Sequence, residues 1–204
     1  MADLARQLEE KQLMKRVKAK DIAAFDILYN RYKSRILNYI YRFLGNFHMA
    51  EEVAQEAFVK FYTRAYIYDA GKAAVSTWFY RIAANMAKNR LRYEKIRRGA
   101  SLDEPLIIDE NAVSIFEAVP DRQQGADLLL RQQEVSQAIQ KALDCLAPKY
   151  REAFILCDMQ DMPYNEAAEI LGCPEGSVAS RLNRAREKMA QLLRLKFNIT
   201  DGSI

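Results

Sequence analysis

The chain has 204 residues, of which 50% are hydrophobic and 28% charged, a composition typical of a globular protein. It has only 7 Gly and 5 Pro, and no apolar run approaches the ~18 residues of a membrane span, which excludes collagen-like, low-complexity and membrane-spanning classes. With 1 histidine and 3 cysteines that form no CxxC pair, a His-rich metal site or a Ser-His relay is not expected. We therefore expect neither a metal nor a cofactor.

The cellular compartment is suggested by the N-terminus and by the cysteines. The segment M-A-D-L-A-R-Q-L-E-E-K lacks the apolar core of a signal peptide, which argues against export. Three cysteines cannot all pair internally, which fits a reducing compartment. These features predict a cytoplasmic protein without direct membrane insertion.

Charge is distributed unevenly along the chain. Residues 1–98 carry 20 basic and 10 acidic side chains, residues 99–130 carry 1 and 7, and residues 131–204 carry 10 of each. A basic block, an acidic connector and a neutral block predict two domains joined by a flexible acidic linker. The basic block indicates a polyanionic partner, although a positive surface can also serve solubility alone.

Helical periodicity dominates the basic block. A first helix is predicted over residues 22–44, where apolar side chains recur at steps of three and four and Gly45 ends the pattern. A second is predicted over about residues 49–65, and a third is expected to run from a Ser76 or Thr77 cap to about Arg98. Residues 1–20 are helix-prone and form an N-terminal extension. No stretch alternates like a strand beside a hairpin turn, so the fold class is all-α.

Periodicity fails between Gly99 and Gly125, where we expect an extended linker with a short helical turn near residues 114–118. Helices are predicted again over about residues 127–146, 148–158, 164–171 and 174–197. Pro148, Pro163 and Pro174 each stand where a helix is expected to begin. The predicted domains are therefore residues 21–98 and 131–198, flanked by the extension, the linker 99–130 and a tail at 199–204.

A helix-turn-helix motif is the strongest local signal. Ala168, Gly172 and Val178 have its spacing, because a small residue allows close helix packing and glycine tolerates the positive φ of the turn. On the second helix, one apolar stripe is expected to be buried, formed by Val178, Leu182, Ala185, Met189 and Leu192. The other sides carry hydroxyls and arginines suited to guanine edges and phosphates: Ser177, Ser180, Arg181 and Arg184. The alternative is an amphipathic hairpin whose arginines only solvate a face.

A basic helix is the second signal. Its predicted polar stripe steps by 4, 3, 4 and 3 through Arg81, Asn85, Lys88, Arg92 and Lys95, with Asn89 beside it. Such a stripe can follow a phosphate backbone, while asparagines can bond base edges. Three nearby tyrosines are candidates for stacking on unpaired bases, namely Tyr66, Tyr68 and Tyr80. Trp78, Ile82 and Met86 are expected to face the other helices.

An acidic-polar face is predicted on the second helix. Val53, Ala57, Phe58 and Phe61 share its inner side, and Glu52, Gln55 and Glu56 project outward. A solvated face is the ordinary explanation of such a cluster. A basic protein partner is the other explanation, since an acidic patch cannot serve the same nucleic acid as the basic helix.

Together these segments resemble bacterial sigma-70-family initiation factors of the extracytoplasmic-function (ECF) subgroup. The resemblance covers about residues 21–98 and 131–197 and is carried by three motifs in the family's order: A-E-E-V-A-Q-E-A-F-V-K-F-Y, S-T-W-F-Y-R-I-A-A-N-M-A-K-N and E-A-A-E-I-L-G-C-P-E-G-S-V-A-S-R-L-N-R-A-R-E-K. It implies a sigma-2-like helical bundle and a sigma-4-like helix-turn-helix domain. It also implies a non-enzymatic function, namely promoter-specific transcription initiation.

The resemblance further implies roles for individual residues. Glu52, Gln55 and Glu56 would dock on a coiled coil of the largest subunit of core RNA polymerase. The −10 element of promoter DNA would be held as a single strand by Arg81, Asn85, Lys88, Asn89, Arg92 and Lys95, with the loop at residues 66–74. The −35 duplex would be read by Ser177, Ser180, Arg181 and Arg184. The linker would run toward the RNA path of the polymerase, and an anti-sigma factor is a further possible partner.

Two other function classes are alternatives to promoter-specific transcription initiation. A stand-alone helix-turn-helix regulator accounts for the C-terminal motif but leaves the basic helix and the acidic face without a role. An enzyme such as a nuclease is disfavoured, because the scattered glycines form no phosphate-binding loop and no Asp, Glu or His group has metal-ligand spacing.

Overall fold

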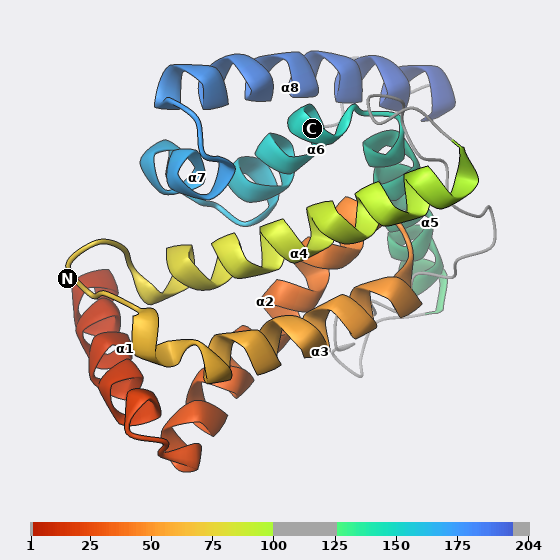
Figure 1. Ribbon diagram of the computed structural model, residues 1–204. Coiled ribbons are helices and arrows are strands. Elements are labelled where there is room, and N and C mark those ends of the chain that lie inside the picture. The colour runs from red at the N-terminus through yellow and green to blue at the C-terminus, as the bar shows by residue number, and fades with distance from the viewer. Residues whose placement is uncertain (1, 100–125, 198–204) are drawn as a thin grey trace.

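The computed structural model describes residues 2–99 and 126–197, and within these ranges every regular element is helical (Figure 1). The predicted all-α class is confirmed. The elements are α1 (Ala2–Lys18), α2 (Ile22–Leu44), α3 (Phe47–Thr63), η1 (Ala65–Ile67), α4 (Val75–Arg98), α5 (Ala126–Asp144), α6 (Pro148–Phe154), the π-helical turn η2 (Ile155–Met159), α7 (Tyr164–Leu171) and α8 (Glu175–Phe197). The central part of the expected linker, including the turn predicted near residues 114–118, lies outside the described residues. No described helix is long and apolar enough to cross a membrane.

Helices α1 to α4 form an N-terminal unit with an aromatic core. The predicted inner side of α3 is confirmed, since Val53, Ala57, Phe58 and Phe61 are all buried. The rings of Phe58 and Phe61 lie 4.8 and 4.3 Å from that of Phe79 on α4. Asp21 and Asn46 cap α2 and α3 by accepting bonds from backbone N–H groups. Caps and aromatic packing together set where these helices begin and how they meet.

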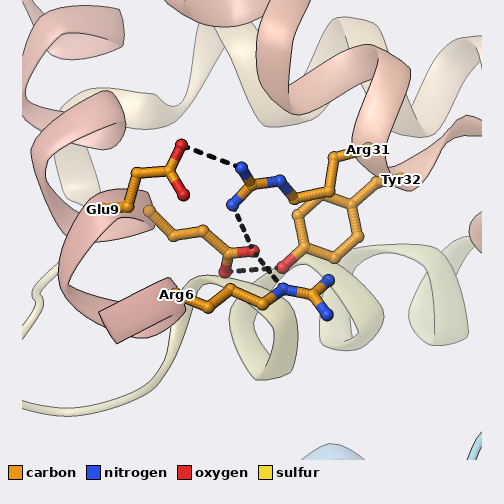
Figure 2. Close-up of polar contacts among 5 residues, drawn as sticks. Arg6, Glu9, Arg31 and Tyr32 are labelled. Atoms are coloured by element: carbon orange, nitrogen blue, oxygen red, sulfur yellow. Dashed lines mark hydrogen bonds and ion pairs between the residues drawn. The ribbon is translucent and has the colours of Figure 1, made fainter. Parts of the chain in front are cut away.

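The N-terminal extension folds as α1 and packs on α2. Its apolar side buries Leu13, Met14 and Val17 in the core. Figure 2 shows the polar contacts that fix its register: the Tyr32 hydroxyl donates to Glu10 Oε2 at 2.7 Å, and Arg31 donates to Glu9 and Glu10 at 3.0 and 3.1 Å. Burial beside the Glu10 carboxylate raises the pKa of Tyr32, so its hydroxyl stays protonated and able to donate. The extension is therefore part of the folded N-terminal unit.

Helices α5 to α8 form a C-terminal unit that contains the predicted helix-turn-helix. Gly172 ends α7 with φ of 64°, as the turn requires. The predicted stripe of α8 is confirmed, because Val178, Leu182, Ala185 and Met189 are buried and Leu192 packs against them. Arg186 donates two bonds to Asp158, at 2.8 and 2.6 Å, which tie α8 to η2. The turn and this pair fix the orientation of α8.

Buried polar contacts join the two units. The Arg151 guanidinium of α6 donates to the carbonyl oxygens of Phe43 and Asp144, each at 2.7 Å. The Phe43 carbonyl is near the end of α2, where helical carbonyls lack partners within the helix. Arg42 of α2 donates to the Ser136 hydroxyl of α5 at 2.9 Å. The C-terminal unit thus supplies the polar partners for the end of α2.

Helix α4 lies between α3 of its own unit and α7 of the C-terminal unit (Figure 1). Its buried residues accordingly occupy two faces. The expected cap at Ser76 or Thr77 is wrong: α4 begins after Ala74, and the Thr77 hydroxyl donates to Glu166 of α7 at 2.9 Å. The predicted inner stripe is only partly buried, because Trp78, Ile82 and Met86 lie at the edge of the core. Both differences arise because a second side of α4 packs against the C-terminal unit, which the periodicity of the sequence does not indicate.

The helix boundaries otherwise follow the sequence prediction closely: the helices predicted over residues 22–44 and 164–171 match, and the other ends shift by at most four residues. The largest shift is the end of the helix predicted over residues 148–158, which continues after Phe154 as the π-helical turn η2. Pro148 stands in the first turn of α6, as predicted, whereas Pro163 is the residue before α7 and Pro174 the residue before α8. Proline suits both places, because neither position needs a backbone N–H donor.

Gly45 provides a test of the junction. Its φ is 73°, and an added Cβ would lie 2.7 Å from Asp144 Oδ1, an atom also bound by Gln140 and Arg151. We expect Gly45→Ala to lower the free energy of unfolding by about 2–4 kcal/mol in urea denaturation, since backbone strain and the clash add. Gly172→Ala is the matched control, with a similar φ and open space around it. Equal losses in the two variants would contradict this account of the junction.

Lys88 provides a second test. Its ammonium lies 3.3 Å from Oε1 of buried Glu152, and the Tyr39 hydroxyl donates to the same atom at 3.2 Å. We expect Lys88→Ala to reduce the free energy of unfolding at pH 8 by about 1–3 kcal/mol, less than for a fully buried pair because Lys88 is partly solvated. Exposed Asn89 supplies the control variant Asn89→Ala, which should change stability by under about 0.5 kcal/mol.

The loss in Lys88→Ala should depend on pH. Burial raises the pKa of Glu152 above its ordinary 4.5, and Lys88 partly lowers it again, so removing Lys88 raises that pKa further. Below pH 4.5 the carboxyl is protonated in both the folded and unfolded states and does not need Lys88. The loss therefore grows as pH rises through the folded pKa and is largest above it. A difference from wild type that is constant between pH 4 and pH 8 would contradict the contact.

Candidate nucleic-acid and protein interfaces

The outer face of α8 presents the predicted hydroxyl–arginine set. Ser180 and Arg184 are exposed, and Ser177 and Arg181 are half-buried beside them. The buried stripe of α8 lies on the other side, so the four side chains share the surface of the helix-turn-helix. This arrangement places the polar side of the N-terminal half of α8 at the surface of the C-terminal unit.

Two residues of α6 join this face, and sequence analysis did not identify them. The Arg184 guanidinium donates to the Tyr150 hydroxyl at 3.2 Å, and the Lys149 ammonium lies 5.2 Å from the centre of the Tyr150 ring. The bond from Arg184 lowers the pKa of Tyr150, while it raises that of Arg184. No periodicity links α6 to α8, so the sequence carried no signal for this pairing. The contact holds Arg184 in one orientation at the protein surface.

The polar stripe of α4 is divided between solvent and the C-terminal unit. Asn85, Asn89 and Arg92 are exposed. Arg81 lies 3.5 Å from Glu169 of α7, and Lys88 contacts Glu152 as described above. Lys95, expected to continue the stripe, is only 1% exposed. The structure thus brings three of the six residues to the surface and holds the other three against or within the protein.

The loop before α4 presents one of the three tyrosines suggested for base stacking. Tyr66 in η1 is 71% exposed. Tyr68 is buried, packs 5.3 Å from the Trp78 ring, and donates from its hydroxyl to the Ala73 carbonyl. Tyr80 is buried too, and burial raises its pKa to about 12. In this conformation the stacking expectation is therefore wrong for Tyr68 and Tyr80, and Tyr66 is the tyrosine available at this surface.

The acidic-polar face of α3 lines an open groove of about 620 Å³. Gln55 and Glu56 are exposed on it, as predicted. Glu52 is held from α4 by Arg90, at 3.0 Å, and lies 3.3 Å from His48 Nδ1. Residues from α3, the turn after it and α4 complete the lining, namely Val59, Lys60, Thr63, Arg64 and Met86. The groove thus combines three acceptor side chains with two cations, Lys60 and Arg64, and an apolar floor formed by Val59 and Met86.

An apolar groove of about 510 Å³ adjoins it between α2 and α3. Gln55 and Val59 line both grooves. The apolar groove also exposes the rings of Phe25, Tyr29 and Tyr62, which pack in a cluster with Phe58. Phe25 and Tyr29 follow the three- and four-residue spacing of the apolar side chains of α2, yet Phe25 is only half-buried and Tyr29 is exposed.

Two family models match the chain. Sigma-70 region 2 matches residues 28–96, which include most of α2, all of α3 and nearly all of α4. Sigma-70, region 4 matches residues 136–189, which include the second half of α5, all of α6 and α7 and most of α8. The two matches thus fall on the two helical units, in the order of the chain.

Curated relatives match over nearly the whole length. The chain is 36% identical to the RNA polymerase sigma-H factor of Pseudomonas aeruginosa over 92% of this chain and 95% of that protein. It is 35% identical to the ECF RNA polymerase sigma factor SigW of Bacillus subtilis, covering 90% and 96%. The ECF RNA polymerase sigma-E factor of Escherichia coli is also 35% identical, with coverage of 90% and 94%.

Solved structures share the fold. CnrH, solved in complex with the cytosolic domain of CnrY, aligns with a TM-score of 0.65 over 92% of this chain and 99% of that chain, at 20% identity. The sigma factor RpoE of Bartonella quintana, solved with the anti-sigma factor NepR, aligns with a TM-score of 0.63 over 84% and 98%, at 22% identity. The sequence relatives decide the family: the chain belongs to the sigma-70 family of RNA polymerase sigma factors, in the ECF group.

Proposed function

We propose that this sigma factor directs promoter-specific initiation through three separate binding surfaces: the groove of α3, the exposed part of the α4 stripe and the outer face of α8. The observation that carries the proposal is their separation, since acidic and basic surfaces lie on different elements and each has the chemistry of a different partner. The chain would act in the cytoplasm, and it would contribute binding, while the polymerase performs catalysis.

The outer face of α8 is assigned to the −35 duplex. A hydroxyl–arginine set at the surface of a recognition helix, with Ser180 and Arg184 exposed, has the donors and reach for base edges and phosphates. The bond from Arg184 to Tyr150 supports this role, because an arginine held at the surface loses less freedom when it binds. In this proposal residues 131–198 supply duplex affinity and register.

The −10 element is assigned to α4 and the loop before it. Asn85, Asn89 and Arg92 form an exposed donor surface, and Tyr66 nearby offers an aromatic ring. Extruding a base from the stack costs a few kcal/mol, which a fitted pocket recovers only for the right base. Selection of the melted strand by residues 21–98 would therefore determine where the duplex opens. Arg81, Lys88 and Lys95 would join only after the C-terminal unit moves away from α4.

Core polymerase is assigned to the groove of α3. Gln55 and Glu56 are exposed acceptors, while Arg90 holds Glu52 in place. A basic helical surface of the polymerase would pair with these acceptors and cover the apolar floor. The linker, residues 99–130, would then extend between the two DNA-binding units toward the RNA path.

An anti-sigma factor is the proposed inhibitory partner. RpoE was solved in complex with the anti-sigma factor NepR, and CnrH with the cytosolic domain of CnrY. We assign this chain a partner of the same kind, which would compete with core polymerase or DNA for the surfaces described above.

Core binding can be tested at the α3 groove. We expect the double variant Gln55→Ala, Glu56→Ala to bind core polymerase about 10-fold to 100-fold more weakly by fluorescence anisotropy, because two exposed acceptors at one interface are removed. Glu51→Ala is the control, since Glu51 is an exposed acid on the same helix that does not line the groove. Unchanged affinity in the double variant would remove this surface from the proposal.

DNA binding can be tested as two separable steps on a promoter selected with core polymerase from a library by run-off transcription. Arg184→Ala should weaken −35-dependent binding by about 1–3 kcal/mol, or roughly 10-fold to 100-fold.

Asn85→Ala should retain core binding and −35 dependence but reduce permanganate reactivity of −10 thymines, because strand capture is impaired. Normal permanganate reactivity in Asn85→Ala, or equal affinity for −35 and scrambled DNA in wild type, would refute the respective assignment.

A further inference from the structure

Three cations from α6 and α8 gather near one phenol oxygen at the surface of the C-terminal unit. Helix α6 packs along α8, and the Arg184 guanidinium donates to the Tyr150 hydroxyl at 3.2 Å. The Lys149 ammonium lies 5.2 Å from the centre of the Tyr150 ring. The bond from Arg184 lowers the pKa of Tyr150 most, and the charges of Lys149, Arg184 and Arg181 lower it further. These four side chains are referred to below as the cationic cluster.

The cationic cluster is not neutralised by carboxylates in the part of the chain that the structure describes. Elsewhere on α8, Arg186 is paired with the Asp158 carboxylate at 2.6 Å. None of the three cations of the cluster makes an ion pair with a described residue. Two acids, Glu187 and Glu152, act on its arginines only at longer range. Because like charges held together repel one another, an anion that joined the cluster would stabilise it.

The cluster is open to solvent at the edge of the surface assigned to the −35 duplex. Lys149 and Arg184 are exposed, and Tyr150 and Arg181 are half-buried. The two arginines are three residues apart and are therefore neighbours on one side of α8. In helix-turn-helix complexes the recognition helix enters the major groove, and a neighbouring helix crosses the DNA backbone. The position of Lys149 and Tyr150, on another helix beside α8, is that of a backbone contact.

A backbone phosphate matches the chemistry of these two side chains. A phenol hydroxyl can accept and donate at the same time. The Tyr150 hydroxyl accepts from Arg184, and its own proton is donated to no described residue. A phosphate oxygen could accept that proton, and the Lys149 ammonium could bind the same phosphate. Contacts of this kind fix the position of a protein on the duplex, whereas arginines in the groove read the bases.

We infer that α6 is a second DNA-binding element of this chain: Lys149 and Tyr150 bind one backbone phosphate beside the groove that α8 enters. This inference rests on the proposed function of α8 and adds to it two residues that no pattern in the sequence indicated. Tyr150 would then contact Arg184 and the phosphate together, which links backbone binding to the reading of bases.

Lys149 is tested through the salt dependence of binding. The probes are a duplex that carries the −35 element and a scrambled duplex of the same length, bound by the full-length chain in complex with core polymerase. We expect Lys149→Ala to weaken binding to both duplexes by about threefold to tenfold and to reduce the slope of log K against log salt by about 0.9, because one phosphate contact is lost. Lys141→Ala is the matched control, since Lys141 is an exposed lysine of α5 outside the cluster. Equal slopes in the two variants would overturn the inference.

Tyr150 is tested by Tyr150→Phe, which keeps the ring and removes the hydroxyl. We expect a loss of about threefold in affinity with an unchanged salt slope, because a neutral donor releases no counterion. The loss should persist when Arg184→Ala is also present, since the phosphate bond remains. A hydroxyl that only held Arg184 in place would have no effect in that background, and this result would overturn the inference. Urea denaturation should give wild-type stability for Tyr150→Phe, as expected for a surface group.

Arg184→Ala alone separates failure of this inference from failure of the proposed function. If it removes the preference for the −35 duplex while Lys149→Ala behaves like Lys141→Ala, the phosphate contact is wrong and the −35 assignment stands. If Arg184→Ala leaves the preference unchanged, α8 does not read the −35 element and both ideas fail.

Discussion

The burial of α4 on two sides is the constraint on which the rest of the structure depends. One side packs the Phe79 ring against Phe58 and Phe61 of α3. The other side donates hydrogen bonds to Glu166 of α7 and to Gln160, the residue after η2, and places Lys88 beside Glu152 of α6. A single helix therefore completes the core of the N-terminal unit and provides the surface on which the C-terminal unit rests. Any change in the distance between the units must expose one face of α4.

The two sides of α4 differ in the kind of contact that would be lost if the helices separated. The α3 side is aromatic and apolar, and its separation would expose a large hydrophobic area. On the α7 side, hydrogen bonds and ion pairs accompany an apolar core that is continuous through both units, so separation would release polar groups to water and also expose apolar surface. Around Arg151 the polar contacts are deeply buried and replace the missing helical partners of α2. The structure thus combines an aromatic N-terminal core with an interface in which polar contacts surround shared apolar packing.

Much of this fold follows from sequence pattern. The parts that could not be predicted from the pattern have one cause in common. The stripe of α8, Gly172 in the turn and the inner side of α3 were predictable because they depend on contacts within a few turns. Thr77 resembled a helix cap, Tyr80 a stacking ring and Lys95 a phosphate contact, yet all three are buried on the second face of α4. The hydrogen-bond partners of Thr77 and Tyr80 lie 89 and 80 residues away in the chain, so no local periodicity indicates them. Arg90 and Tyr150 were missed for the same reason.

The central claim is that α4 exchanges the C-terminal unit for promoter DNA. The most direct measurement is the distance between spin labels at two exposed positions, Ser34 on α2 and Glu187 on α8, in a functional full-length chain. Double electron–electron resonance would be recorded on the free chain and on its open complex with core polymerase and promoter. The account predicts one short distance in the free chain and a clearly longer one in the open complex. The same distance in both, with the complex able to initiate transcription, would contradict it.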